Sequence, residues 1–205
     1  MDIKLNFINL SNDVNNTQIV VFQKNVSTDF DELAVAWKVI SNCGRGANHP
    51  FVFPMATSVT ASDSNGNYMP KKVAQNGQLF TVQRSHSGNV LAAAGAASTS
   101  REVQVRNDLG ASAINASIFK DGRLLSTKTG IAPGQKAVFE FKPTLWIGTA
   151  AQVEEGRLMN SAVISDINTE LSLLGIASAD IVMTGGGGGT AAVPYRFELT
   201  NIVMG

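Results

Sequence analysis

The chain has 205 residues, and its 16 basic and 16 acidic side chains give a formal net charge of zero at pH 7. Only 16% of the residues are charged, and the longest run of basic residues is Lys71-Lys72. Because proteins that bind nucleic acids cluster Lys and Arg on one face, this composition argues against nucleic acid as a partner. A neutral surface repels copies of itself only weakly, which favours self-association.

Cys43 is the only cysteine, which excludes an internal disulfide and a cysteine-rich zinc site. The apolar run at residues 90–97 is among the longest in the chain and is far shorter than the roughly 18 residues of a membrane span. The first residues lack the basic start and continuous apolar stretch of a signal peptide. We therefore expect a cytoplasmic protein without a transmembrane segment, released, if at all, by a non-standard route.

The first predicted elements are strands. Residues 3–7 alternate apolar and polar side chains, which is typical of a strand with one buried face. Residues 19–22 are apolar on both faces, as in an interior strand. Residues 28–40 are ambiguous: Phe30, Leu33 and Trp37 have helical spacing, but the same stretch also alternates, and its β-branched residues favour a strand from about Ala34.

Turn sequences divide the middle of the chain. Asn-Gly and Ser-Gly pairs occur in residues 64–67, 75–77 and 87–89, and residues 102–106 alternate as a strand would. Residues 114–129 form the clearest hairpin sequence, with Asp121-Gly122 at its centre. We expect a type I′ turn there, in which both central residues have positive φ.

The last part of the chain shows the same two kinds of strand pattern. Residues 137–142 and 195–200 alternate, and residues 181–183 are apolar on both faces. Residues 159–174 are ambiguous between helix and strand. Many short strands separated by turns predict an all-β protein, namely a single antiparallel β-sandwich of about ten strands with one or two short helices at most. No linker or fixed-period repeat is visible, so we expect one domain over residues 1–205.

Some segments resemble a known family. Three short segments resemble, in the same order, segments of bacterial RhiA-like proteins, which are small β-rich proteins of unknown mechanism. These segments are residues 7–13, 20–24 and 33–37. Residues 137–148 and 174–187 resemble segments of uncharacterised bacterial proteins with the same layout. The resemblance implies a bacterial β-sandwich, and it supplies no family active site.

Five consecutive glycines lie near the C-terminus: Gly185, Gly186, Gly187, Gly188 and Gly189. A phosphate-binding loop would require a following Lys and a helix, whereas a strand sequence follows here. Glycine is also the residue whose ordering costs most entropy. We therefore expect a connection between two strands in which a neighbouring backbone approaches closely, either within the chain or from a second copy.

Asp63, Asn65 and Asn67 place oxygen ligands at alternate positions, which suits Ca²⁺. The spacing departs from that of an EF-hand, since Gly66 is fourth in the loop and Ala74 is twelfth. A hairpin turn is the preferred interpretation and a Ca²⁺ site the alternative.

Residues 43–49 place Cys43 and His49 on either side of Arg45 in an expected loop. A Cys-His nucleophile pair, or an iron site that uses both His49 and His86, is conceivable, but nothing in the spacing supports either. A lone small hydrophobic Cys and a loop-capping His are the simpler interpretation. Arg45 and His49 join the glycines as candidates for an assembly contact.

No cluster of titratable groups and no cofactor loop is recognisable, so we expect no enzyme and no cofactor. The leading hypothesis is a structural protein that packs with copies of itself, because its strand edges carry little charge. The alternative is a carbohydrate- or membrane-lipid-binding module of the lectin or lytic-toxin type that uses loops at residues 44–54 and 62–68. An enzyme, the third class, would need His49 or His86 in a pocket with a carboxylate.

Overall fold

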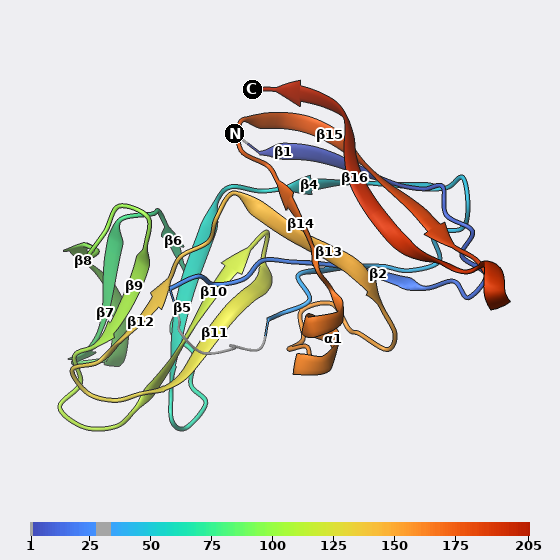
Figure 1. The fold of residues 1–205 in the computed structure, drawn as a ribbon. Coiled ribbons are helices and arrows are strands. Elements are labelled where there is room, and N and C mark those ends of the chain that lie inside the picture. Colours follow the sequence, from blue (N-terminus) through green and yellow to red (C-terminus); the bar gives the residue numbers. More distant parts are fainter. Residues whose placement is uncertain (1, 28–33) are drawn as a thin grey trace. The chain divides into compact units, whose positions relative to one another are not determined.

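The computed structural model describes residues 2–27 and 34–205 (Figure 1). Strands dominate this part of the chain, which confirms the all-β prediction. Its contacts divide into two compact units, and each is described by itself. The terminal unit comprises residues 2–24, 34–55 and 143–205, and the inserted unit comprises residues 25–27 and 56–142.

The described residues form sixteen strands in four four-stranded sheets, so a single sandwich of about ten strands is not confirmed. Alternation reports that one face of a strand is buried, but not which sheet the strand joins or in which direction it runs. Two of the strand pairs are parallel rather than antiparallel. One domain over residues 1–205 stays a prediction.

The first sheet of the terminal unit, called here the β1 sheet, has β1 in its interior. In pairing order its strands are β16 (Val193–Met204), β15 (Ile176–Gly186), β1 (Ile3–Asn9) and β4 (Asn48–Phe53). Strand β1 runs parallel to β15 and antiparallel to β4. Its alternating apolar residues, Ile3, Leu5 and Phe7, are buried, as the sequence pattern predicts.

The second sheet of this unit, the β2 sheet, has a strand, β2, that is buried on both faces. In pairing order its strands are β14 (Thr169–Ser172), β13 (Thr144–Ala150), β2 (Gln18–Phe22) and β3 (Lys38–Ile40). Val20 and Phe22 pack with Ile167, which follows the helix α1 (Ser161–Asp166). The alternate residues Ile19 and Val21 are also buried, so the prediction of an interior strand here is confirmed.

The two ambiguous segments resolve differently. Helix α1 lies within residues 159–174 and begins after Asn160, whose side chain accepts a hydrogen bond from the backbone N–H of Val163. In residues 28–40, positions 28–33 lie outside the described residues. Residues 34–40 contain no helix, and the strand expected from about Ala34 begins at Lys38, where residues 38–40 form β3. Trp37 is buried against Phe53, with ring centroids 5.4 Å apart.

The first sheet of the inserted unit, the β5 sheet, contains the expected hairpin. In pairing order its strands are β11 (Arg123–Ile131), β10 (Ile114–Lys120), β5 (Thr57–Asp63) and β6 (Lys72–Ala74). Asp121 and Gly122 join β10 to β11 with φ values of 52° and 72°. Both values are positive, as a type I′ turn requires, so the hairpin prediction is confirmed.

The second sheet of this unit, the β7 sheet, carries the features on which the functional argument rests. In pairing order its strands are β12 (Lys136–Phe139), β9 (Val103–Asn107), β7 (Gln78–Ser85) and β8 (Gly88–Ala96) (Figure 1). Strands β7 and β9 are parallel. Phe80, Val105 and Phe139 point into the core of the unit, which leaves the other face and the two edges of the sheet for interactions.

Candidate functional site

Strand β8 forms one edge of the β7 sheet. It is nine residues long, pairs with β7 alone among the described strands, and contains no Lys, Arg, Asp, Glu or Pro. Its register with β7 is regular from Gly88 to Ala93 and shifts by one residue beyond it, which is a bulge. The residues from Ala93 to Ala96 are exposed. Charges and prolines are the usual protection against pairing with another strand, so this edge is unprotected over its regular part.

The opposite edge of the same sheet, at β12, is covered. The backbone N–H of Val26 donates to the carbonyl of Glu140 at 2.9 Å, and Asn25 forms an antiparallel bridge with Phe141. The Asn25 side chain donates to the carbonyl of Val138 at 3.0 Å and accepts the N–H of Glu140 at 2.9 Å. A short segment therefore occupies the carbonyl of Val138 and both backbone groups of Glu140, at the C-terminal end of the β12 edge.

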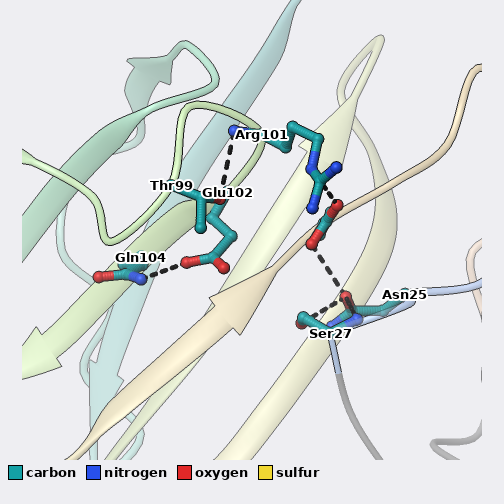
Figure 2. A network of polar contacts seen from close by, with 7 residues as sticks. Asn25, Ser27, Thr99, Arg101, Glu102 and Gln104 are labelled. Carbon is teal, nitrogen blue, oxygen red and sulfur yellow. Dashed lines mark hydrogen bonds and ion pairs between the residues drawn. The ribbon is translucent and has the colours of Figure 1, made fainter.

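Polar side chains hold this covering segment in place. The Ser27 hydroxyl donates to Asn25 Oδ1 at 2.8 Å or to the carbonyl of Val138 at 2.7 Å. The Arg101 guanidinium forms an ion pair of 2.9 Å with the carboxylate of Glu140. Figure 2 shows Asn25 and Ser27 together at one end of this network and the long side chain of Arg101 reaching down from the other.

The remaining sheet edges are short or interrupted. Strands β3, β6 and β14 have three or four residues each, which is too few for an extensive ladder. Pro50 lies in the edge strand β4, and Pro194 lies in the edge strand β16, which also has a left-handed residue, Asn201, with φ of 49°. Strand β11 carries charges and two register shifts. Strand β8 is therefore the least protected edge in the described part of the chain.

The outer face of the β7 sheet is hollowed next to this edge. An open pocket of about 520 Å³ lies over Leu79 of β7, Gln104 and Arg106 of β9, and Lys136 of β12. Ala96, at the end of β8, contributes to its wall. The volume lies within the range of about 300–1,000 Å³ that is usual for small-molecule sites.

A buried polar side chain forms the floor of this pocket. Gln104 is only 2% exposed, and its Oε1 accepts a hydrogen bond of 3.1 Å from Lys136 Nζ. Its amide nitrogen donates to the carboxylate of Glu102. Lys136 Nζ also donates to Ser98 Oγ at 2.7 Å. Alternation in residues 102–106 places Gln104 on the polar side of the strand, yet the residue is buried between strands β7 and β12, with which it pairs at Leu79 and Val138.

The first two residues of the glycine run lie at a close backbone approach, as predicted. A Cβ at Gly185 would lie 2.2 Å from the carbonyl oxygen of Pro194, and one at Gly186 would lie 2.6 Å from the Tyr195 ring. Both residues have positive φ, at 87° and 78°. No larger residue fits these two positions without movement of the backbone or the ring.

The rest of the run is more open. A Cβ at Gly187 would have its nearest described neighbour at 3.5 Å, and Gly188 and Gly189 have none within 4 Å. Gly189 begins the short 3₁₀ helix η1 (Gly189–Ala191), which leads into β16. Contacts within the chain therefore explain why glycine is required at two of the five positions, Gly185 and Gly186. For the other three, a contact with a second copy stays a prediction.

The Asp63 loop is a turn held by its own carboxylate. Asp63 Oδ1 accepts the backbone N–H groups of Asn65 and Asn67, each at 2.9 Å, and Oδ2 accepts from the Asn67 side chain at 3.0 Å. These donors, the Asn67 side chain first among them, lower the pKa of Asp63. The preferred interpretation as a turn is confirmed. The described residues contain no group of three or more His, Cys, Asp or Glu side chains that could hold a metal ion.

His49 lies in β4, so the prediction of a loop over residues 44–54 is wrong for Asn48–Phe53. Pro50 indicates a loop in a sequence, but an edge strand tolerates proline because one side of it has no partner. Arg45 is exposed in the turn before this strand. Burial, together with Lys38, lowers the pKa of His49 against the opposing effect of Glu155, and burial raises the pKa of Cys43.

His86 is exposed in the turn between β7 and β8. Neither His86 nor His49 is hydrogen-bonded to a carboxylate within the part of the chain that the structure covers, so the expected His–carboxylate pair is not seen at either histidine there.

Comparison with family models, with curated proteins and with solved structures finds no match. No helix among the described residues is long and apolar enough to cross a membrane. The interpretation of the site therefore rests on the open β8 edge and the adjoining pocket alone.

The sequence carries a signal for the edge but none for the pocket. The uncharged run at residues 90–97 marks the edge. The residues that line the pocket, such as Gln104 and Lys136, come from strands about thirty positions apart, so no local pattern marks them.

Proposed function

We propose that this chain is a non-enzymatic structural protein that assembles with copies of itself, and that β8 of one copy pairs with β8 of another. The observation that carries the proposal is the asymmetry of the β7 sheet. Its β12 edge is capped by residues 25–27, while its β8 edge has neither a charged residue nor a proline. An unprotected edge strand is a template for pairing with another chain, so the β8 edge is the expected place of self-association.

The side chains of β8 suit such pairing. Val90, Leu91 and the alanines that follow are small or β-compatible, and none of them places a charge opposite its own copy. The net charge of zero keeps long-range repulsion between copies weak. Pairing an edge with the same edge of a second copy is isologous, so one open edge gives a closed two-fold dimer. Six regularly paired residues form a small interface, and we therefore expect association that depends on concentration.

Sedimentation velocity over a wide range of concentrations tests the proposal. The variant Ala93→Lys places a charge at the exposed end of the regular part of β8, and it should remain a monomer at concentrations where the natural chain dimerises. Val73→Lys is the matched control, because it adds the same charge at a residue that is 75% exposed on the three-residue edge strand β6. It should dimerise like the natural chain.

Circular dichroism spectra of both variants should match that of the natural chain, since neither position is buried. A natural chain that stays strictly monomeric at the highest concentration would refute self-assembly. Dimerisation of Ala93→Lys with unchanged affinity would refute the assignment to β8.

A further inference from the structure

We propose that the pocket on the outer face of the β7 sheet binds a small organic oxyanion, either a carboxylate or a phosphate ester. The proposal is independent of self-assembly, since the pocket is complete within one copy. Its cationic groups are Lys136 and Arg106, and none of the residues that line it is acidic.

The two cations lie side by side. Lys136 and Arg106 are directly paired in the antiparallel register of β12 with β9, so their side chains project from the same face of the sheet. Like charges opposite one another destabilise a strand pair unless anions compensate them. Asp108 compensates Arg106 through two hydrogen bonds, from Nε to Oδ1 at 2.6 Å and from Nη2 to Oδ2 at 2.9 Å.

Lys136 has no carboxylate in direct contact among the described residues. Its ammonium group donates to two neutral oxygen atoms, Ser98 Oγ at 2.7 Å and Gln104 Oε1 at 3.1 Å. The carboxylate of Glu102 is bound to the amide nitrogen of Gln104, whereas the ammonium group of Lys136 binds the oxygen of the same amide. An ammonium group has three N–H donors, so one remains for a ligand.

Two hydrogen bonds orient the ammonium group of Lys136 before any ligand binds. Gln104 is 2% exposed and both ends of its amide are hydrogen-bonded, so it cannot rotate without losing a contact. Lys136 is itself exposed to solvent, and its two hydrogen bonds direct the ammonium group toward the floor of the pocket. A cation that is already ordered loses less conformational entropy when a ligand binds.

The other residues that line the pocket determine which chemical class of ligand fits it. Leu79, Ala96 and Ala97 provide an apolar wall on the β7–β8 side, whereas Gly134 and Gln135 bring backbone to the other side. This lining fits a molecule with a short apolar body and one anionic end. A neutral sugar or alcohol would leave the charge of Lys136 unmatched.

Titrations monitored by ¹H–¹⁵N correlation spectra of the full chain at low ionic strength test the proposal. The probes are butyrate, glycerol phosphate and inorganic phosphate, with glucose and butanol as neutral controls. We expect saturable shifts of the Ser98, Gln135 and Lys136 amides with the anions and none with the neutral probes. A response to butyrate alone would assign the site to carboxylates, and a response to glycerol phosphate alone would assign it to phosphate esters.

Lys136→Met should weaken anion binding about tenfold or more, and Lys136→Arg should restore most of it, because the charge and a donor return. Lys72→Met is the matched control: it removes an exposed lysine from β6 and should leave binding unchanged. The proposal is wrong if no anion gives a saturable shift, or if the neutral probes bind equally well. Anion shifts of the same size and affinity in Lys136→Met would also overturn it.

Discussion

The hydroxyl of Tyr195 donates a hydrogen bond of 2.9 Å to Oδ1 of Asp13, and so links the start of β16 to the loop before β2. Asp13 also accepts the backbone N–H groups of Asn15 at 3.0 Å and Thr17 at 2.7 Å. Partial burial raises the pKa of this carboxyl, but these donors together outweigh it and hold the pKa below its ordinary value of 3.8. The ring of Tyr195 is also the group that closes over Gly186.

The first prediction concerns pH. A carboxyl whose pKa is lower in the folded state stabilises the fold above its ordinary pKa and loses that contribution as the pH falls through the folded value. The natural chain should therefore lose stability below about pH 4. Asp13→Asn should lose less over the same interval, because its amide does not titrate.

Urea denaturation at pH 7 and at pH 3 measures how much stability the natural chain and Asp13→Asn each lose over this interval. Tyr195→Phe keeps the carboxylate and removes one donor, so it should cost about 1 kcal/mol at pH 7 and retain part of the pH dependence. Equal loss of stability between pH 7 and pH 3 in the natural chain and in Asp13→Asn would contradict this assignment.

The second prediction separates the glycines of the run. Gly185→Ala places a Cβ 2.2 Å from the carbonyl oxygen of Pro194 at a residue with φ of 87°, so both steric overlap and backbone strain oppose it. We expect a loss of about 3 kcal/mol or more in the free energy of unfolding. Gly188→Ala is the control, because its φ is −120° and no described atom lies within 4 Å of the new Cβ. Similar midpoints for the two variants in thermal denaturation would show that the close approach at Gly185 does not affect the stability of the fold.

The third prediction concerns the packing of Ile167 on the β2 sheet. A Cβ at Gly148 of β13 would lie 2.8 Å from both Cγ1 and Cγ2 of Ile167, which is 2% exposed. Gly148→Ala should cost about 1–3 kcal/mol through overpacking. Ile167→Ala alone should cost about 2–5 kcal/mol through a cavity.

The double variant tests whether the two effects share one cause. The added methyl group partly fills the space that Ile167→Ala empties, so the combined loss should be smaller than the sum of the single losses by about 1 kcal/mol or more. Strict additivity in a denaturation cycle would show that Gly148 is required for another reason.

Local features of this fold could be predicted from the sequence because they depend on neighbours in the chain. Asp121-Gly122 specifies its own backbone geometry, and the alternation in residues 3–7 reports which face is buried. The burial of Gln104 could not be predicted in this way, because Lys136 and Leu79 reach it from strands far away in the sequence. The same holds for the parallel pairing of β7 with β9, since a hydrophobic pattern has no direction.

The last prediction concerns the covered β12 edge of the β7 sheet and its effect on pairing through the open β8 edge. Asn25→Ala removes the acceptor of the Glu140 N–H and the donor to the Val138 carbonyl, so the segment that covers β12 should detach. The loss of these bonds should cost about 1–3 kcal/mol. Arg101→Ala is the control, because it removes an ion pair whose arginine side chain is 75% exposed and should cost less than about 1 kcal/mol.

The assembly of this variant should change as well. With β12 uncovered, the β7 sheet has two open edges, and β12-to-β8 pairing between copies does not close on itself. Light scattering should therefore detect species larger than a dimer for Asn25→Ala at concentrations where Arg101→Ala and the natural chain stop at dimers. Adding Ala93→Lys to Asn25→Ala blocks the β8 edge and should abolish the larger species. Their persistence in this double variant would show that growth proceeds through another surface.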